Sequence, residues 1–469
     1  MQILKEDTIA AIATALGEGG IGVIRISGPA SLSVLKKVFT PAFPVKKWRS
    51  HRMIFGEIAG EDGKMLDEVL AVWMAEGRSY TGEEVVEIHG HGGRLNLLQL
   101  LRRILAEEVR VAEPGEFTRR AFLNGRIDLT QAEAIAEMIN AKNERALEMA
   151  RNHLQGHLQK HLHSLAERSL MLAAQVESWI DFPEEFDPAL DESVGRIMKD
   201  LEDFQQALRE LLDSYQVGQQ LQQGWSILLL GRPNAGKSSL FNKLNGEEKA
   251  IVTSLPGTTR DLLEAQIALG GIQLTLTDTA GLRKRSSEVK DQEVEAHEAI
   301  EQIGVGRALN AAEQANLLLA VVDLSRAWSE EDQQVLEACQ GRPTVLICNK
   351  ADLPREMPEE KLEAFQAVWR IETSCKEDLG IGDLRKRLHN YIEQETPAHE
   401  LVISNERQRD ALAQALHFAE KSMREGYELG PEFMAEDLRL TRNALSEITG
   451  QVSSEEILGT IFSSFCIGK

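Results

Sequence analysis

The sequence predicts a multidomain protein of α/β plus α class, in which mixed α/β domains accompany a long helical region. The chain has 469 residues, a length that implies about three domains. An apolar run at 227–230 leads directly into a glycine-rich phosphate loop and a helix start, which is the strand–loop–helix order of a nucleotide-binding α/β domain. Residues 122–215 and the tail beyond Ile403 have helical periodicity instead.

The N-terminal part of the chain predicts a separate α+β domain. Over residues 1–121, short apolar strand-like runs alternate with helical patterns. From residue 122 the pattern becomes helical, as in Ala132–Ile139. We therefore place the first domain boundary between residues 121 and 122.

The phosphate loop is a complete G-x-x-x-x-G-K-S motif from Gly231 to Ser238. Backbone N–H groups and the helix N-terminus that follows would face the phosphates. Lys237 would reach the β- and γ-phosphates, and the Ser238 hydroxyl would bind Mg²⁺. A chance glycine-rich turn is disfavoured because both flanking elements are present.

Two further motifs indicate guanine as the base. Asp278–Gly281 ends an alternating strand, and Asn349–Asp352 follows a buried run at 343–348. The Asp352 carboxylate can accept hydrogen bonds from the N1–H and the exocyclic amine of guanine. Adenine lacks this donor pair, and the unpaired acceptor would cost about 1–3 kcal/mol. Ser374–Lys376 would back the base, so the sequence predicts a GTP-binding domain.

The group that positions the attacking water is not obvious. Small signalling GTPases have a glutamine directly after the D-x-x-G glycine, but this chain has Leu282, which cannot orient water. Thr258 and Thr259 fit a switch loop in which one threonine closes over Mg²⁺. The side-chain oxygen of Asn234 could bind a monovalent cation beside the phosphates, or Asn234 could merely cap the loop. The spacing of the residues alone does not distinguish cation binding from loop capping.

The positions that we expect to contact GTP lie in these motifs and in the loop ahead of Thr259. They are Asn234, Ala235, Gly236, Lys237, Ser238, Ser239, Thr253, Ser254, Leu255, Pro256, Gly257, Thr258, Thr259, Asp278, Thr279, Ala280, Gly281, Asn349, Lys350, Asp352, Ser374, Cys375 and Lys376.

The motif set G-R-P-N-A-G-K-S-S-L, G-T-T-R-D, D-T-A-G-L-R and N-K-x-D resembles the TrmE–Era–Septin branch of GTPases. The two ends of the chain are more specific, and they resemble the MnmE (TrmE) family of tRNA-modification GTPases. The similarity covers essentially the whole chain. It rests on Asp7–Thr14, Gly20–Gly28, Ser79–Glu84, Gly90–Gly93, Pro114–Thr118 and Phe465–Lys469.

This resemblance implies an activity and its partners. Members act with the FAD-dependent flavoprotein MnmG as a heterotetramer. Together they add an aminomethyl or carboxymethylaminomethyl group at C5 of wobble uridine in certain tRNAs. A one-carbon unit comes from 5-formyltetrahydrofolate or methylenetetrahydrofolate. The folate contacts fall on Arg25, Glu87, Arg126 and Lys469, where Arg126 replaces the lysine usual in the family.

The resemblance also implies how GTP is hydrolysed. The catalytic positions would be Lys237, Thr259 and a water-positioning glutamate, and Mg²⁺ would lie between Ser238 and Thr259. The glutamate precedes an Ile-Gly-[IV] signature, which selects Glu301. Extra residues between 286 and 299 leave Glu288 and Glu298 as rivals. The family's K⁺ contacts fall on Asn234, Thr253, Leu255 and Thr258, and K⁺ promotes pairing of two G domains in a homodimer.

The architecture implied by the resemblance is an insertion. Residues 1–121 would bind folate and form the dimer. Residues 122–222 and 394–469 would make one discontinuous helical domain, and residues 223–393 would be an inserted Ras-like P-loop GTPase domain. The Gln-rich segment 216–223 and the Glu/Pro-containing segment 393–400 are expected as exposed connectors.

Composition limits where such a protein works. No apolar run reaches the roughly 18 residues of a membrane helix, and no signal peptide is visible. The four cysteines have no paired spacing, which suits a reducing cytoplasm. For Cys466, thiol chemistry and a structural role both stay open. The net charge of -22 should repel RNA, so we expect tRNA to be held largely by the partner.

A second functional class is compatible with the GTPase motifs. A regulatory or assembly GTPase would use its flanking domains only to bind RNA or protein. Such a protein has no need of Arg25, Glu87 and Lys469. Folate binding would therefore distinguish the two classes.

Overall fold

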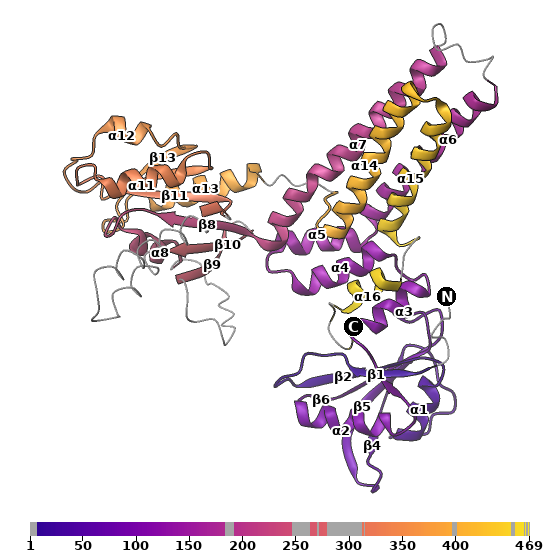
Figure 1. Ribbon diagram of the computed structural model, residues 1–469. Coiled ribbons are helices and arrows are strands. Elements are labelled where there is room, and N and C mark those ends of the chain that lie inside the picture. Colours follow the sequence, from indigo (N-terminus) through magenta and orange to yellow (C-terminus); the bar gives the residue numbers. More distant parts are fainter. Residues whose placement is uncertain are drawn as a thin grey trace, which may run out of the picture. The chain divides into compact units, whose positions relative to one another are not determined.

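The computed structural model describes residues 7–182, 192–245, 263–269, 272–278, 312–313, 315–395, 401–451, 455–463, 465 and 468. It divides into two compact units, and Figure 1 colours the chain along its sequence. Unit 1 contains residues 1–139, 150–209 and 410–469, and unit 2 contains residues 140–149 and 210–409. The predicted class, mixed α/β with a helical region, is confirmed, whereas the division into segments 1–121, 122–222, 223–393 and 394–469 stays a prediction.

The N-terminal part of unit 1 is built on one sheet. Its strand order in the described residues is β3-β4-β5-β6-β2-β1-β7. The strands are β1 (Ile9–Ile12), β2 (Ile21–Ser27), β3 (Phe39–Pro41), β4 (Arg52–Ala59), β5 (Met65–Met74), β6 (Val85–His91) and β7 (Arg110–Val111). Alternate residues such as Ile24 and Ile26 pack with helices α1 (Ser31–Val38) and α2 (Arg94–Leu105). Because side chains alternate along a strand, Arg25 lies on the opposite face.

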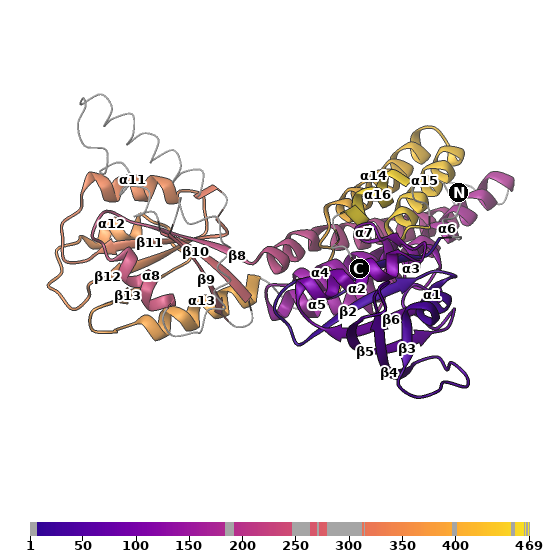
Figure 2. The ribbon, with the colours of Figure 1, turned by 90° about the horizontal axis from the view of Figure 1, so that it is seen from below.

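The rest of unit 1 is helical. Its helices, some shared with unit 2, are α3 (Glu116–Leu123), α4 (Leu129–Asn140), α5 (Glu144–Leu154), α6 (His157–Asp181), α7 (Glu192–Gln223), α14 (Glu406–Glu428), α15 (Pro431–Thr449) and α16 (Glu455–Ser463). Along α6, a buried stripe from Leu158 to Val176 recurs at helical spacing. Ser169 Oγ donates to the Leu438 carbonyl and Gln205 Nε2 to the Ala419 carbonyl, both at 2.8 Å. Segments far apart in sequence thus pack together, as Figures 1 and 2 show.

The Gln-rich segment 216–223 differs from the expectation of an exposed connector. It forms the last turns of α7. Val217 and Leu221, four residues apart on one helix face, pack with Met149 and Val402. Glutamine is a good helix former, so a Gln-rich sequence with two apolar residues at this spacing continues the helix.

Unit 2 contains a second sheet, with the order β13-β12-β11-β8-β10-β9 in its described residues. The strands are β8 (Trp225–Leu230), β9 (Leu263–Leu269), β10 (Ile272–Asp278), β11 (Leu317–Asp323), β12 (Thr344–Asn349) and β13 (Trp369–Thr373). All neighbours are parallel except β9 and β10. β11 and β12 are buried along their whole length, as expected for parallel strands covered on both faces.

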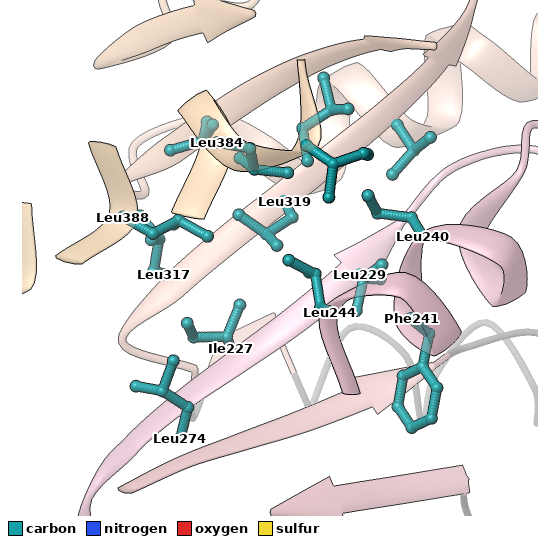
Figure 3. Packing of buried hydrophobic residues seen from close by; sticks show 14 of the residues in the cluster. Ile227, Leu229, Leu240, Phe241, Leu244, Leu274, Leu317, Leu319, Leu384 and Leu388 are labelled. Atoms are coloured by element: carbon teal, nitrogen blue, oxygen red, sulfur yellow. The ribbon is translucent and has the colours of Figure 1, made fainter. Parts of the chain in front are cut away.

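Helices cover both faces of this sheet. Figure 3 shows Leu240 of α8 (Lys237–Asn245) and Leu384 of α13 (Ile381–Glu395) packing on Leu229 and Leu319. On the other face, α11 (Glu330–Cys339) and α12 (Glu359–Glu363) pack against the remaining strand residues. The carboxyl ends of β8, β11 and β12 meet at one sheet edge, where ligands bind in open α/β sheets.

Candidate functional site

The phosphate loop connects β8 to α8 and folds as its glycines require. Gly231 and Gly236 have φ values of +157° and +104°, and Asn234 is left-handed with φ 59°. A side chain at Gly236 would collide with the amide of Asn349. Glycine is therefore needed where the loop turns towards the first turn of α8, which begins at Lys237.

The buried side chains of Lys237 and Asn349 form hydrogen bonds to backbone carbonyls of this loop. The buried Lys237 Nζ donates to the carbonyls of Gly231 at 2.7 Å and Arg232 at 3.0 Å. Asn349 Nδ2 donates to the Ala235 carbonyl at 2.8 Å, and Thr373 Oγ1 donates to Asn349 Oδ1 at 3.2 Å. Two of the sequence motifs are thus in direct contact, whereas Ser238 and Ser239 are exposed at the start of α8.

The loop after β12 carries the residues expected to recognise the base. Lys350 has φ 64° and its Nζ lies 2.7 Å from Asp323 Oδ2 at the end of β11. Burial alone would raise the pKa of Asp323, but hydrogen bonds from Lys350 and Ser325 hold it below its ordinary value. Asp352 is exposed, and a hydrogen bond with Ser374 lowers its pKa. Asp352 is therefore an ionised acceptor at neutral pH.

Ser374–Lys376 follow β13 and lie next to this loop. Ser374 is buried, Cys375 is half-buried and Lys376 is exposed. Burial raises the pKa of the Cys375 thiol, so it stays protonated at neutral pH. Through the hydrogen bond between Ser374 and Asp352, this segment adjoins the base-recognition loop.

Several predicted site residues lie outside the described residues. Asp278 is described as the last residue of β10, and its backbone pairs with that of Leu229 in β8. The other predicted positions that the structure does not describe are Thr253, Ser254, Leu255, Pro256, Gly257, Thr258, Thr259, Thr279, Ala280, Gly281, Leu282, Glu288, Glu298, Glu301, Cys466 and Lys469.

In unit 1, Arg25 and Glu87 form a cross-strand pair. They are directly opposite each other on β2 and β6, and Arg25 Nη2 lies 2.9 Å from Glu87 Oε1. Each side chain is 19% exposed, so the pair is sheltered yet reachable. The guanidinium lies 5.3 Å from the ring centre of Tyr80 and 5.7 Å from that of Phe117. Such stacking fixes the plane of an arginine.

The loop that carries Tyr80 is held by a buried arginine. Arg120 Nη1 lies 3.2 Å from Glu83, and its Nη2 lies 2.9 Å from Glu116 and 2.7 Å from Asp7. Arg126 contacts the same loop, since its Nη1 donates to the Gly77 carbonyl at 3.4 Å. Glu83 belongs to the S-Y-T-G-E-E segment at 79–84, but nothing in the local sequence indicates that Arg120 pairs with it.

The end of the chain returns to this sheet. Gly468, with φ +98°, packs against the backbone of Ile12 and Ala13. On the neighbouring strand β2, Ile12 pairs with Ile24, the residue before Arg25. The tail therefore reaches the strand next to the one that carries Arg25.

Two protein-family models match most of the chain. The family described as "MnmE helical domain" matches residues 129–466, and "GTP-binding protein TrmE N-terminus" matches residues 8–126. The chain belongs to the MnmE family. A tRNA modification GTPase MnmE from Synechococcus sp. (strain JA-3-3Ab) is 41% identical over 468 residues, covering 99% of this chain and 98% of that protein.

Two further MnmE relatives agree over their full lengths. The protein of Heliobacterium modesticaldum is 40% identical, with 99% of each chain covered, and that of Hydrogenovibrio crunogenus is 41% identical, with 100% of each chain covered. As an MnmE family member the chain is a GTPase of tRNA modification, and the resemblance seen in its motifs and termini is confirmed. Among the described helices, none is both long and apolar enough to cross a membrane.

Proposed function

We propose that this MnmE family member couples GTP hydrolysis to modification of wobble uridine. With the flavoprotein MnmG it would add an aminomethyl or carboxymethylaminomethyl group at C5, using a folate one-carbon unit. The observation that carries this proposal is the Arg25–Glu87 pair on its aromatic support, because an assembly GTPase has no use for it.

The GTP site draws on several motifs. Asp352 would accept two hydrogen bonds from guanine, and its low pKa keeps it ionised for that role. Lys237 would turn from the loop carbonyls to the β- and γ-phosphates. The exposed Ser238 hydroxyl, with Thr259, would bind Mg²⁺, which supplies positive charge along the phosphates. Glu301 would orient the attacking water, with Glu288 and Glu298 as alternatives.

A potassium role for Asn234 has support in its surroundings. Its side chain is exposed, and within the described residues it makes no hydrogen bond that would cap the loop. An amide oxygen is a suitable ligand for a hard cation. We propose that Asn234, Thr253, Leu255 and Thr258 bind K⁺, and that K⁺ promotes pairing of two G domains in the homodimer.

The unit 1 site suits a folate. The Glu87 carboxylate can accept from the amino group and ring N–H of a pterin, and the Arg25 fork can donate to carbonyl or carboxylate oxygens. Folate bound there supplies the one-carbon unit. Gly468 lies beside β1, which supports a contact from Lys469. Arg126, on the loop of Tyr80, would add a cation.

Folate binding tests the proposal. Calorimetric titration with 5-formyltetrahydrofolate should show binding to the wild type and loss of binding in Arg25→Ala. Arg145→Ala removes an ion pair with Glu393 in unit 2 and serves as the matched control. Mass analysis of wobble uridine in a deletion strain carrying each variant should show the modification lost only with Arg25→Ala. Wild-type protein without folate binding would favour an assembly GTPase.

A further inference from the structure

Arg232, the second residue of the phosphate loop, forms a buried ion pair with Asp332, a residue that belongs to none of the nucleotide motifs. Its side chain is 6% exposed and that of Asp332 is 1% exposed, and Arg232 Nη1 lies 2.9 Å from Asp332 Oδ2. The same nitrogen donates to the Ala327 carbonyl at 3.1 Å. The guanidinium is thus bound to the segment between β11 and α11.

Asp332 is itself fixed in place. It is the third residue of α11 and forms a capping box with Ser329, whose Oγ donates to Asp332 Oδ2 at 2.8 Å. Among the described residues, Arg232 is the cation within ion-pair distance of this carboxylate. The helix cap therefore anchors an acceptor for the arginine of the phosphate loop.

The β11–α11 segment also reaches the guanine side of the site. Arg232 Nη2 donates to the Asp323 carbonyl at 3.4 Å, and the Asp323 carboxylate binds Lys350 at 2.7 Å. One short segment thus contacts the phosphate loop through Arg232 and the base-recognition loop through Lys350. The two loops are thus both joined to Asp323 at the end of β11.

We propose that Arg232 is a positioning residue for GTP binding, and that its pairing with Asp332 holds the phosphate loop in register with the Asn349–Asp352 loop. Arg232 does not contact the nucleotide in this role; it acts through the loop backbone. A buried ion pair is a poor source of net stability. The planar fork, however, imposes one geometry on the groups that it joins.

Four variants separate positioning from stability. They are Arg232→Met, Arg232→Lys, Asp332→Asn and the double variant Arg232→Met with Asp332→Leu. The measurements are release of fluorescent mant-GDP by stopped flow, KM and kcat for GTP, and thermal unfolding. The double variant matters most, because apolar replacement of a buried pair usually preserves stability.

We expect faster mant-GDP release and a higher KM in Arg232→Met, on the order of 10- to 100-fold, with a smaller change in kcat. Arg232→Lys should rescue binding only in part, since an ammonium cannot reproduce the fork. Asp332→Asn should follow Arg232→Met. The double variant should unfold near the wild-type temperature and still release mant-GDP rapidly.

Arg355→Met is the matched control. It breaks an ion pair with Glu359 in the same unit, where both side chains are more exposed, and it should leave nucleotide binding unchanged. Wild-type mant-GDP release and KM in the double variant would show that the pair only stabilises the fold, and would overturn the proposal. If Arg232→Met does not fold, the double variant and Arg232→Lys decide in the same way.

Discussion

The side chain of Asn349 donates a 2.8 Å hydrogen bond to the backbone carbonyl of Ala235. Both residues are buried, with exposures of 2% and 0%. The loop at the end of β12 is therefore joined directly to the phosphate loop at the end of β8. Two motifs that are 114 residues apart become one binding site through this bond.

Replacing Asn349 should weaken both binding and stability. Asn349→Ala leaves the Ala235 carbonyl buried without its donor, which costs about 1–3 kcal/mol. We expect a lower unfolding midpoint in urea and faster mant-GDP release. Thr373→Val is the control, because it removes the bond at the other end of Asn349 and keeps the contact to Ala235. Thr373→Val also leaves a buried oxygen, Asn349 Oδ1, without its donor, so both variants should lose stability and mant-GDP release is the measurement that separates them. Equally fast release in the two variants would contradict this assignment.

Gly236 is expected to tolerate no side chain. Gly236→Ala would place a methyl group against the Asn349 amide at a φ of +104°, and such backbone strain costs about 1–3 kcal/mol. Urea unfolding should show the loss, and calorimetry should show weaker GDP binding. Gly195 in α7 has no atom within 4 Å of its added Cβ, so Gly195→Ala should raise stability by about 0.5–1 kcal/mol. A loss of stability in Gly195→Ala would contradict the open space found beside Gly195.

Changing Asp352 should change the preferred base. Asp352→Asn replaces one acceptor oxygen by a donor NH₂ group. The resulting carboxamide matches the 2-carbonyl of xanthine better than the 2-amino group of guanine. Hydrogen bonds to a charged group contribute about 1.5–3 kcal/mol, so GTP affinity should fall on the order of 10- to 100-fold. Competition between GTP and xanthosine triphosphate measures the switch. Asp378→Asn, which alters an exposed pair with Lys243, should leave the preference unchanged.

His91 should titrate above its ordinary range. Its Nδ1 lies 2.6 Å from the buried carboxylate of Asp67, and this hydrogen bond raises the pKa of His91. A raised folded-state pKa means that the contribution of the pair to stability is complete below the unfolded value of about 6.5. It is lost as pH rises through the folded value. An NMR titration should give a midpoint above that value, and Asp67→Asn should lower it. An unchanged midpoint in Asp67→Asn would contradict the pairing.

Much of the nucleotide site follows from local sequence. The strand at 227–230, the phosphate loop and the helix after it are contiguous, so their order alone places Lys237 at the start of α8. The position of Asp352 follows similarly, because parallel strands end at the same edge of a sheet. The position of Lys237 thus depends on the chain nearby, whereas that of Asp352 also depends on the parallel alignment of β8, β11 and β12.

Contacts between distant segments could not be predicted in this way. Arg232 and Asp332 are 100 residues apart, and neither lies in a periodic pattern that would pair them. The only local signal was the Ser329–Asp332 capping-box spacing. That Arg25 and Glu87 are directly opposite depends on strand register, which a sequence alone does not show. The roles of Glu301, Thr259 and Lys469 stay predictions.

The pairing of α6 with α15 and of α7 with α14 affects how the protein can fold during synthesis. The buried stripe of α6 leaves the ribosome early, but its partner α15 follows only after the GTPase segment from β8 to α13 has been made. Until then, α6 lacks the helix that packs along it. The nascent chain should therefore depend on chaperone protection during this interval, and truncation before α14 should produce an aggregating fragment.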